Sequence, residues 1–157
     1  MPEEQATPGG RRFYRRIRSN QWQDKAGRII QDIVFHVRDD TEGLSVFDAA
    51  IAAPRAVLQH LLNEWDKIAD KSEKDRKWVV KQWEIHGASV EALVNSGWGV
   101  AEVPEALFLR CGFRPSAQVD PDGHLVFEGT VADFQEQSLE IIDDPMCRVL
   151  SNDECLV

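Results

Sequence analysis

The stretch FRPSAQVDPDGHLVFE, residues 113–128, predicts a β-hairpin. Pro121 presets the backbone angle that a turn needs, and Gly123 can take a positive φ. The residues on both sides of this turn have strand-like composition. Antiparallel pairing of two strands is therefore part of the predicted fold.

Apolar residues at helical spacing predict helices in the middle of the chain. Pro54 sits where a first helical turn tolerates proline, and apolar residues follow at every third or fourth position, which predicts an amphipathic helix over 54–69. Ser72, followed three residues later by Asp75, resembles a capping arrangement and introduces a second predicted helix at 72–86. Further helices are predicted at 89–95, 104–112 and 131–142, and strands at 12–18, within 29–37, at 44–47 and at 98–103.

These elements predict an α+β fold, a single domain in which three to four helices pack on a mixed or antiparallel sheet of about five strands. The length of 157 residues fits one domain. Residues 1–10 are expected to be a flexible leader. Residues 11–142 form the predicted domain, with a charged helical insertion at 63–97, and residues 143–157 form an acidic C-terminal tail that we expect to be loosely held.

The composition excludes several classes of protein. No apolar run reaches the roughly 20 residues that cross a bilayer, and residues 1–12 lack the apolar core of a secretory signal. The three cysteines, Cys111, Cys147 and Cys155, are an odd number with no CxxC spacing. They indicate a reducing, cytoplasmic setting and favour neither a disulfide framework nor a structural zinc site.

The net charge of −9 is concentrated at the end of the chain. Residues 118–157 contain ten acidic residues and one basic residue, Arg148, so this segment alone carries −9. Such a surface repels nucleic acid and anionic lipid, and it favours a basic protein partner. The opposite pole is a run of five arginines near the N-terminus: Arg11, Arg12, Arg15, Arg16 and Arg18.

The arginine run has two interpretations. Guanidinium groups on a strand can clamp a phosphate or carboxylate, which makes Arg15, Arg16 and Arg18 candidate ligand- or partner-binding residues. The other interpretation is a solvated edge strand whose charges pair with the acidic C-terminal region. By strand alternation, Arg16 lies opposite Phe13 and Ile17, so we expect it to be the more functional arginine.

Three of the five tryptophans fall in the helical middle of the chain. The helical spacing of Trp65, Trp78 and Trp83 favours the hydrophobic core, and Trp78 in particular is expected to face the body of the protein. Contact with a partner is the alternative, because aromatic residues are enriched at interface hot spots. Trp78 and Trp83 are therefore also candidate partner-binding residues.

No pattern identifies a catalytic residue, a metal site or a cofactor. His36, His60, His86 and His124 have no partner at metal-ligand spacing, and the chain contains no HExxH, GxSxG, P-loop or GxGxxG motif. Cys111 and His124 flank the same predicted strand and form a conceivable nucleophilic pair. A small buried thiol before Gly112 is the favoured interpretation of Cys111.

Two stretches resemble a group of small, functionally uncharacterised bacterial proteins. The first has Phe13-Tyr14-Arg15-Arg16-Ile17, then Gly27-Arg28, then Gly43-Leu44-Ser45-Val46; the second has Gly99-Val100-Ala101, then Arg110-x-Gly112, then His124 to Gly129. The chain departs from this YRRI…GR…LSV…HxxxxG pattern at 63–97, where a long charged helical stretch replaces a brief connection. The resemblance implies a bacterial cytosolic protein.

The chain also resembles ADP-ribosyltransferase-like toxins. In that plan Arg15 or Arg16 lies on the first strand, Ser45 on a strand before the helix that begins at Pro54, and Glu102 or Glu105 supplies the acid. The resemblance implies NAD as substrate, with a basic group at its pyrophosphate and a carboxylate at its nicotinamide ribose.

The function expected from the sequence is that of a non-enzymatic bacterial protein-binding or accessory module. It would act through the acidic C-terminal surface and the Arg-rich N-terminal strand on a protein partner, without nucleic acid, membrane or cofactor. The alternative is the NAD-using toxin or effector.

Overall fold

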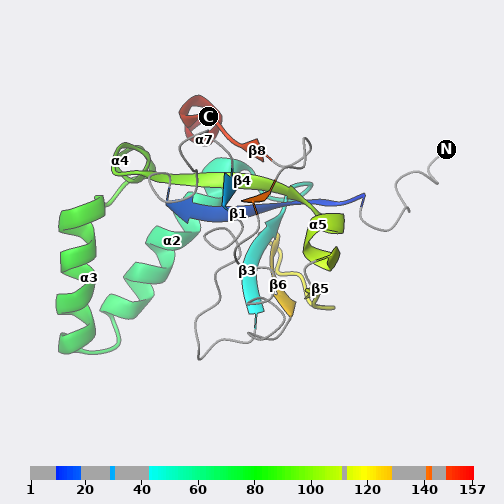
Figure 1. Cartoon of the computed structure of the whole chain (residues 1–157). Coiled ribbons are helices and arrows are strands. Elements are labelled where there is room, and N and C mark those ends of the chain that lie inside the picture. The colour runs from blue at the N-terminus through cyan, green and yellow to red at the C-terminus, as the bar shows by residue number, and fades with distance from the viewer. Residues whose placement is uncertain (1–9, 19–28, 31–42, 111–112, 129–140, 143–147) are drawn as a thin grey trace.

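An open antiparallel sheet of six strands lies at the centre of the structure, in the order β5-β6-β3-β1-β4-β8 (Figure 1). The computed structural model describes residues 10–18, 29–30, 43–110, 113–128, 141–142 and 148–157. The strands are β1 (Arg12–Arg18), β3 (Gly43–Asp48), β4 (Trp98–Pro104), β5 (Arg114–Pro115), β6 (His124–Glu128) and β8 (Arg148–Val149). A separate pair joins β2 (Ile29–Ile30) to β7 (Ile141–Ile142).

Five helices are described: α2 (Pro54–Ala69), α3 (Glu73–His86), α4 (Val90–Asn95), α5 (Glu105–Arg110) and α7 (Asn152–Leu156). The predicted α+β class and the antiparallel pairing are confirmed, with one more strand in the main sheet than the sequence predicts. The predicted helices at 54–69 and 72–86 are confirmed as α2 and α3.

The two faces of the sheet have different cores. On one face, Phe13 contacts Phe127 and Phe108, with ring centroids 4.7 Å and 6.1 Å apart. The other face is covered by α2, whose buried residues recur at helical spacing: Val57, Leu58, Leu61, Leu62, Trp65 and Ala69. Because side chains alternate along a strand, neighbouring residues of β1 face different cores.

The α3 helix packs beside α2 and away from the strands (Figure 1). Ser72 caps its start, since the Ser72 hydroxyl accepts a hydrogen bond from the Asp75 backbone N–H at 3.1 Å. Val79 and His86 are the buried residues of this helix. The rest of α3 therefore carries charged and partly exposed apolar side chains.

The predicted hairpin at 113–128 is confirmed. The two flanking strands, β5 and β6, pair antiparallel, and the Gly123 N–H donates to the Asp120 carbonyl at 2.8 Å. Gly123 has a φ of +90°, the left-handed conformation that glycine takes without strain.

The C-terminal region differs from the prediction in two places. Ile141–Ile142 form strand β7 instead of the end of a helix at 131–142, since two β-branched residues pair readily with Ile29–Ile30; residues 131–140 lie outside the described residues. The expectation of a loosely held tail is wrong for residues 148–157. Leu150 and Cys155 are buried in the core, because β8 pairs with β4 and α7 packs behind it.

Other expectations fall outside the described residues: the leader at 1–9, most of the strand within 29–37, and Cys111 and Cys147. Among the described helices, none combines the length and the apolar character needed to cross a membrane.

Candidate functional site

The arginines of the N-terminal run make contacts with the rest of the fold. Arg11 pairs with Asp48 at 2.8 Å, and Arg12 pairs with Glu102 at 3.2 Å. Arg15 donates from Nη1 to the Ser45 carbonyl at 2.8 Å, and Arg16 donates from Nη1 to a carbonyl of α2. The side chain of Arg18 lies outside the described residues.

Arg15 and Arg16 are partly buried. Desolvation lowers the pKa of each guanidinium to about 10, so both remain charged at neutral pH. Arg16 lies on the face covered by α2, where its bond to the Val57 carbonyl is 3.2 Å long. Phe13 and Ile17 are buried, and the Phe13 ring contacts belong to the opposite face, as the alternation predicts. These contacts give both arginines a structural role.

The two charge poles of the sequence meet at Glu102. Its carboxylate accepts from Arg12 at 3.2 Å and from Arg148 at 3.3 Å. Arg148 also binds both oxygens of Glu154, at 3.0 Å and 2.9 Å, and the hydrogen bond from Arg148 lowers the pKa of that carboxyl to about 2. A chain of ion pairs therefore joins the start of the domain to its end.

The groups of the ADP-ribosyltransferase-like plan are only partly brought together. Arg15 contacts Ser45, but through the backbone carbonyl and not the hydroxyl. Glu102 is held by Arg12 and Arg148, and the buried Glu105 lies 3.9 Å from Arg11.

A pair of histidines that the sequence analysis did not connect lies between α2 and the sheet. The rings of His60 and His124 are nearly parallel, with centroids 5.0 Å apart. The edge of the Phe47 ring packs against both, at 4.9 Å and 5.2 Å. Burial lowers the pKa of His60, helped by the nearby charge of Arg16 and by His124, so that His60 is neutral at pH 7.

His124 is hydrogen-bonded at both ring nitrogens. Its Nε2 lies 2.6 Å from the Ser45 hydroxyl oxygen, and its Nδ1 lies 3.2 Å from a carboxylate oxygen of Asp120. Strand pairing aligns Phe47 with His124, which places Ser45 and His124 on the same face of the sheet. The spacing of Asp120 and His124 across the turn is visible in the sequence, but the contact with Ser45 depends on the strand register.

The tryptophans of the helical region separate into core and surface. Trp65 is 4% exposed, and Trp83 packs against the same core while partly exposed. Trp78 is 46% exposed, so the expectation that it faces the body is wrong. The neighbouring Val79 takes the position that faces α2, since it is fully buried.

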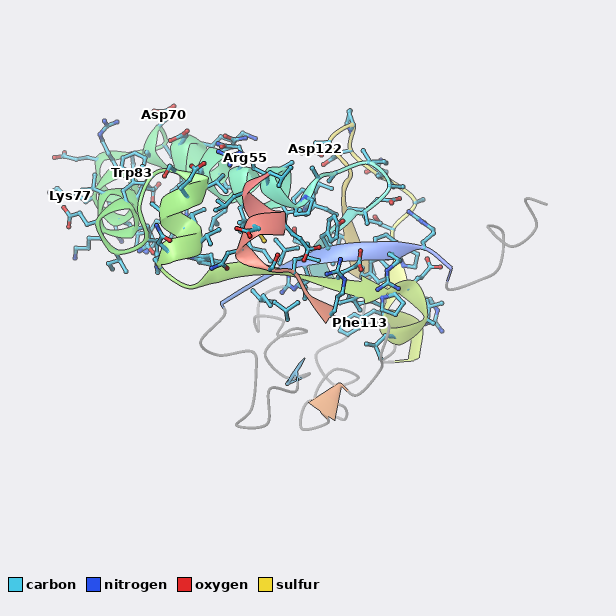
Figure 2. All side chains as sticks on the ribbon, turned by 90° about the horizontal axis from the view of Figure 1, so that it is seen from above. Arg55, Asp70, Lys77, Trp83, Phe113 and Asp122 are labelled. Carbon is cyan, nitrogen blue, oxygen red and sulfur yellow. The ribbon has the colours of Figure 1, made fainter. Side chains whose placement is uncertain are left out.

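The outer surface of α3 exposes apolar side chains among basic ones. Trp78 is 46%, Val80 36% and Ile85 65% exposed. An open hollow of about 490 Å³ lies beside Val80 and does not include Trp78 or Ile85 in its lining, which consists of Glu73, Arg76, Lys77, Val80, Lys81 and Glu84. Figure 2 shows Lys77 and Trp83 at one end of the molecule and Asp122, in the hairpin turn, well away from them.

Among the described residues, no group of three or more histidine, cysteine, aspartate or glutamate side chains is arranged to hold a metal ion. Compared with known proteins, the chain matches no family model, no curated protein and no solved structure at a significant level.

Proposed function

We propose that this chain is a protein-binding module and that α3 carries its contact surface. The observation that carries the proposal is the exposure of Trp78 and Ile85, which are 46% and 65% exposed. They lie seven residues apart, so they share one face of the helix. An exposed aromatic and an exposed aliphatic side chain on one face form the kind of patch that anchors a partner.

Packing among the described residues of the domain does not account for this patch. The α3 helix uses Val79 and His86 to contact the rest of the protein, and α2 supplies the larger share of the core. Trp78 and Ile85 therefore expose apolar area that the fold leaves uncovered. Burial of such area against a partner is favourable by roughly 25 cal/mol for each Å².

The charge around the patch favours an acidic partner. Residues 71–81 contain five basic residues and two acidic ones, a net charge of +3 in a chain of −9, so the remainder carries −12. Lys74 and Lys81 lie one turn on either side of Trp78 and are exposed. An acidic protein surface with an apolar groove complements this arrangement.

The two partner-binding surfaces expected from the sequence, the acidic C-terminal segment and the Arg-rich N-terminal strand, remain predictions. The acidic C-terminal segment would favour a basic partner, but Glu154, one of its described carboxylates, is paired with Arg148. The described arginines of the N-terminal run are likewise engaged within the fold. The α3 surface is therefore the better-supported contact site.

Cross-linking followed by affinity measurement tests this proposal. A photo-reactive amino acid is placed at position 78 and, as the matched control, at position 119, where Val119 is an exposed apolar residue of the hairpin. In cells of the source organism, position 78 should cross-link to an acidic protein that position 119 does not reach. With that protein purified, Trp78→Ala should weaken binding by 10-fold or more, and Val119→Ala should leave it unchanged. Equal cross-linking at both positions, or unchanged affinity of Trp78→Ala, contradicts the proposal.

A bacterial cytoplasmic setting belongs to the same proposal. The resemblance to small bacterial proteins supports it, as do the cysteines without CxxC spacing and the buried free thiol of Cys155. The test is fractionation of the source cells with an antibody to this chain. Recovery outside the cytoplasmic fraction contradicts it.

NAD-dependent transfer is the second candidate function. The contact of Arg15 with Ser45 supports it, since the ADP-ribosyltransferase-like plan has an arginine on the first strand and a hydroxyl on the strand before a helix, and β1 pairs with β3. Incubation of the protein with NAD should then release nicotinamide, and Arg15→Lys should abolish the release. No release above the blank contradicts this function and leaves the α3 proposal unaffected.

A further inference from the structure

We propose that Ser45, His124 and Asp120 form a nucleophilic site that cleaves small, uncharged carboxylic esters. The site is distinct from the α3 surface, because it lies on β3, β6 and the hairpin turn. Figure 2 labels Asp122 of that turn and shows it far from α3.

The geometry is that of a nucleophile, a base and a group that orients the base. The Ser45 hydroxyl oxygen is 2.6 Å from Nε2 of His124, and Nδ1 of His124 is 3.2 Å from Asp120. Such triads are recognised by these contacts and roles, and they recur on unrelated folds in different chain orders.

The hydrogen bonds fix the direction of proton transfer. The Asp120 carboxylate accepts from Nδ1–H of His124, so the Nε2 lone pair faces the Ser45 hydroxyl and accepts its hydrogen. Asp122 accepts from the backbone N–H of His124 at 3.1 Å, which ties the turn to the start of β6. Asp120 thus acts as a positioning residue for His124.

The surroundings hold the His124 ring in place and leave it accessible. Phe47 and His60 pack against the ring, while its side chain remains 20% exposed to solvent. His60 is neutral at pH 7 because burial lowers its pKa, so it places no positive charge beside the ring that must accept a proton. The charged groups that act on His60 include Arg16, Asp122 and Glu64, whose carboxylate lies 3.5 Å from the His60 ring.

The same surroundings indicate the class of substrate. Carboxylates of Asp120, Asp122 and Glu64 border the site, and two guanidiniums lie next to it: Arg15 donates to the Ser45 carbonyl, and the charge of Arg16 acts on His60. Carboxylates outnumber guanidiniums here and the whole chain carries −9, so an anionic substrate is disfavoured. A short uncharged acyl ester meets no such barrier and offers the carbonyl carbon that an activated hydroxyl attacks.

The reaction balances with water as the second reactant. The Ser45 oxygen bonds to the ester carbon, its proton passes to Nε2 of His124, and the carbonyl electron pair moves onto its oxygen. When this pair returns, the bond to the leaving alcohol breaks and the alcohol takes the proton from His124. Water then attacks the acyl-serine in the same way, giving up a proton to His124, which returns it to Ser45 as the acid leaves.

A fluorophosphonate probe tests the nucleophile directly. The folded wild-type protein is incubated with excess probe, and the modified residue is identified by peptide mass spectrometry. The adduct should lie on Ser45, and p-nitrophenyl acetate should be hydrolysed above the buffer rate. An adduct on a different residue, or none in folded wild-type protein, overturns the proposal without the use of any variant.

Variants then separate the roles. Ser45→Ala should abolish labelling, and His124→Gln should slow it at least 100-fold, as loss of the base does in acyl-transfer sites. Asp120→Asn should slow it, and Asp120→Glu should restore part of the rate, which a merely structural residue would not do. Ser116→Ala is the matched control, a hairpin serine with no contact to His124 among the hydrogen bonds of the described residues, and it should label like the wild type. Labelling rates of Asp120→Asn equal to the wild type contradict the role of Asp120.

Discussion

The tryptophan pair of the helical region gives the sharpest test of the packing. Trp65 lies on α2 and is 4% exposed, whereas Trp78 lies on the neighbouring helix α3 and is 46% exposed. A tryptophan side chain has about 200 Å² to bury, worth roughly 5 kcal/mol at 25 cal/mol for each Å². About half of the Trp78 area is buried, so the loss for Trp78→Ala is at most about 2.5 kcal/mol. The methyl group that alanine keeps and its better helix propensity reduce this loss further.

We therefore expect Trp65→Ala to lower the free energy of unfolding by about 3–5 kcal/mol and Trp78→Ala by about 1–2 kcal/mol. The measurement is urea unfolding followed by far-UV circular dichroism, which does not depend on the tryptophans that are removed. Equal losses for the two variants would refute the assignment of Trp78 to the surface. They would also remove the main support for α3 as a contact site.

Three further predictions concern the turn, the histidine pair and a partly buried arginine. Gly123→Ala should lower the free energy of unfolding by about 1–2 kcal/mol, because φ at this position is +90° and an added Cβ would lie 3.1 Å from Ile51. An unchanged midpoint of urea unfolding contradicts this prediction. The pKa of His60 in the folded protein lies below its ordinary 6.5, so its contribution to stability is complete above pH 6.5 and is lost as the pH falls through the folded pKa. The variant His60→Gln should therefore show a smaller fall in Tm between pH 7 and 5 than the wild type. Identical pH profiles of the two proteins contradict this prediction. Arg16→Ala removes the bond to the Val57 carbonyl and should lower Tm by roughly 2–8 °C, whereas an unchanged Tm would restore the purely functional role expected from the sequence.

Local signals in the sequence were sufficient for much of the fold. The Asp-Pro-Asp-Gly turn predicts the hairpin, because proline and glycine restrict the backbone within four residues. The apolar spacing after Pro54 and the cap at Ser72 predict α2 and α3 for the same reason. Each of these features depends on residues that are near neighbours along the chain.

The packed C-terminal segment has a local signal for its last helix, since Ser151 and Glu154 form a capping box, but it has no local signal for its burial in the core. Leu150 and Cys155 belong to two short apolar runs, Val149-Leu150 and Cys155-Leu156-Val157, and they become core residues because β8 pairs with β4. The Leu150 N–H donates to the Val100 carbonyl at 2.9 Å, a contact between residues fifty positions apart. A net charge of −9 over residues 118–157 suggested a solvated tail, since charge describes the surface but not the backbone pairing beneath it.

The sequence by itself determined the helices α2 and α3 and the hairpin at 113–128, and it placed Asp120 four residues before His124. The tertiary structure alone decided which side of α3 meets α2, since Trp78 and Val79 are adjacent and helical spacing permits either to be buried. It also brought Ser45 to His124 across 79 positions, because the register of β3 with β6 sets which side chains share a face. A shift of that register by one residue would turn Ser45 to the opposite face of the sheet, and no property of the two residues themselves specifies the register.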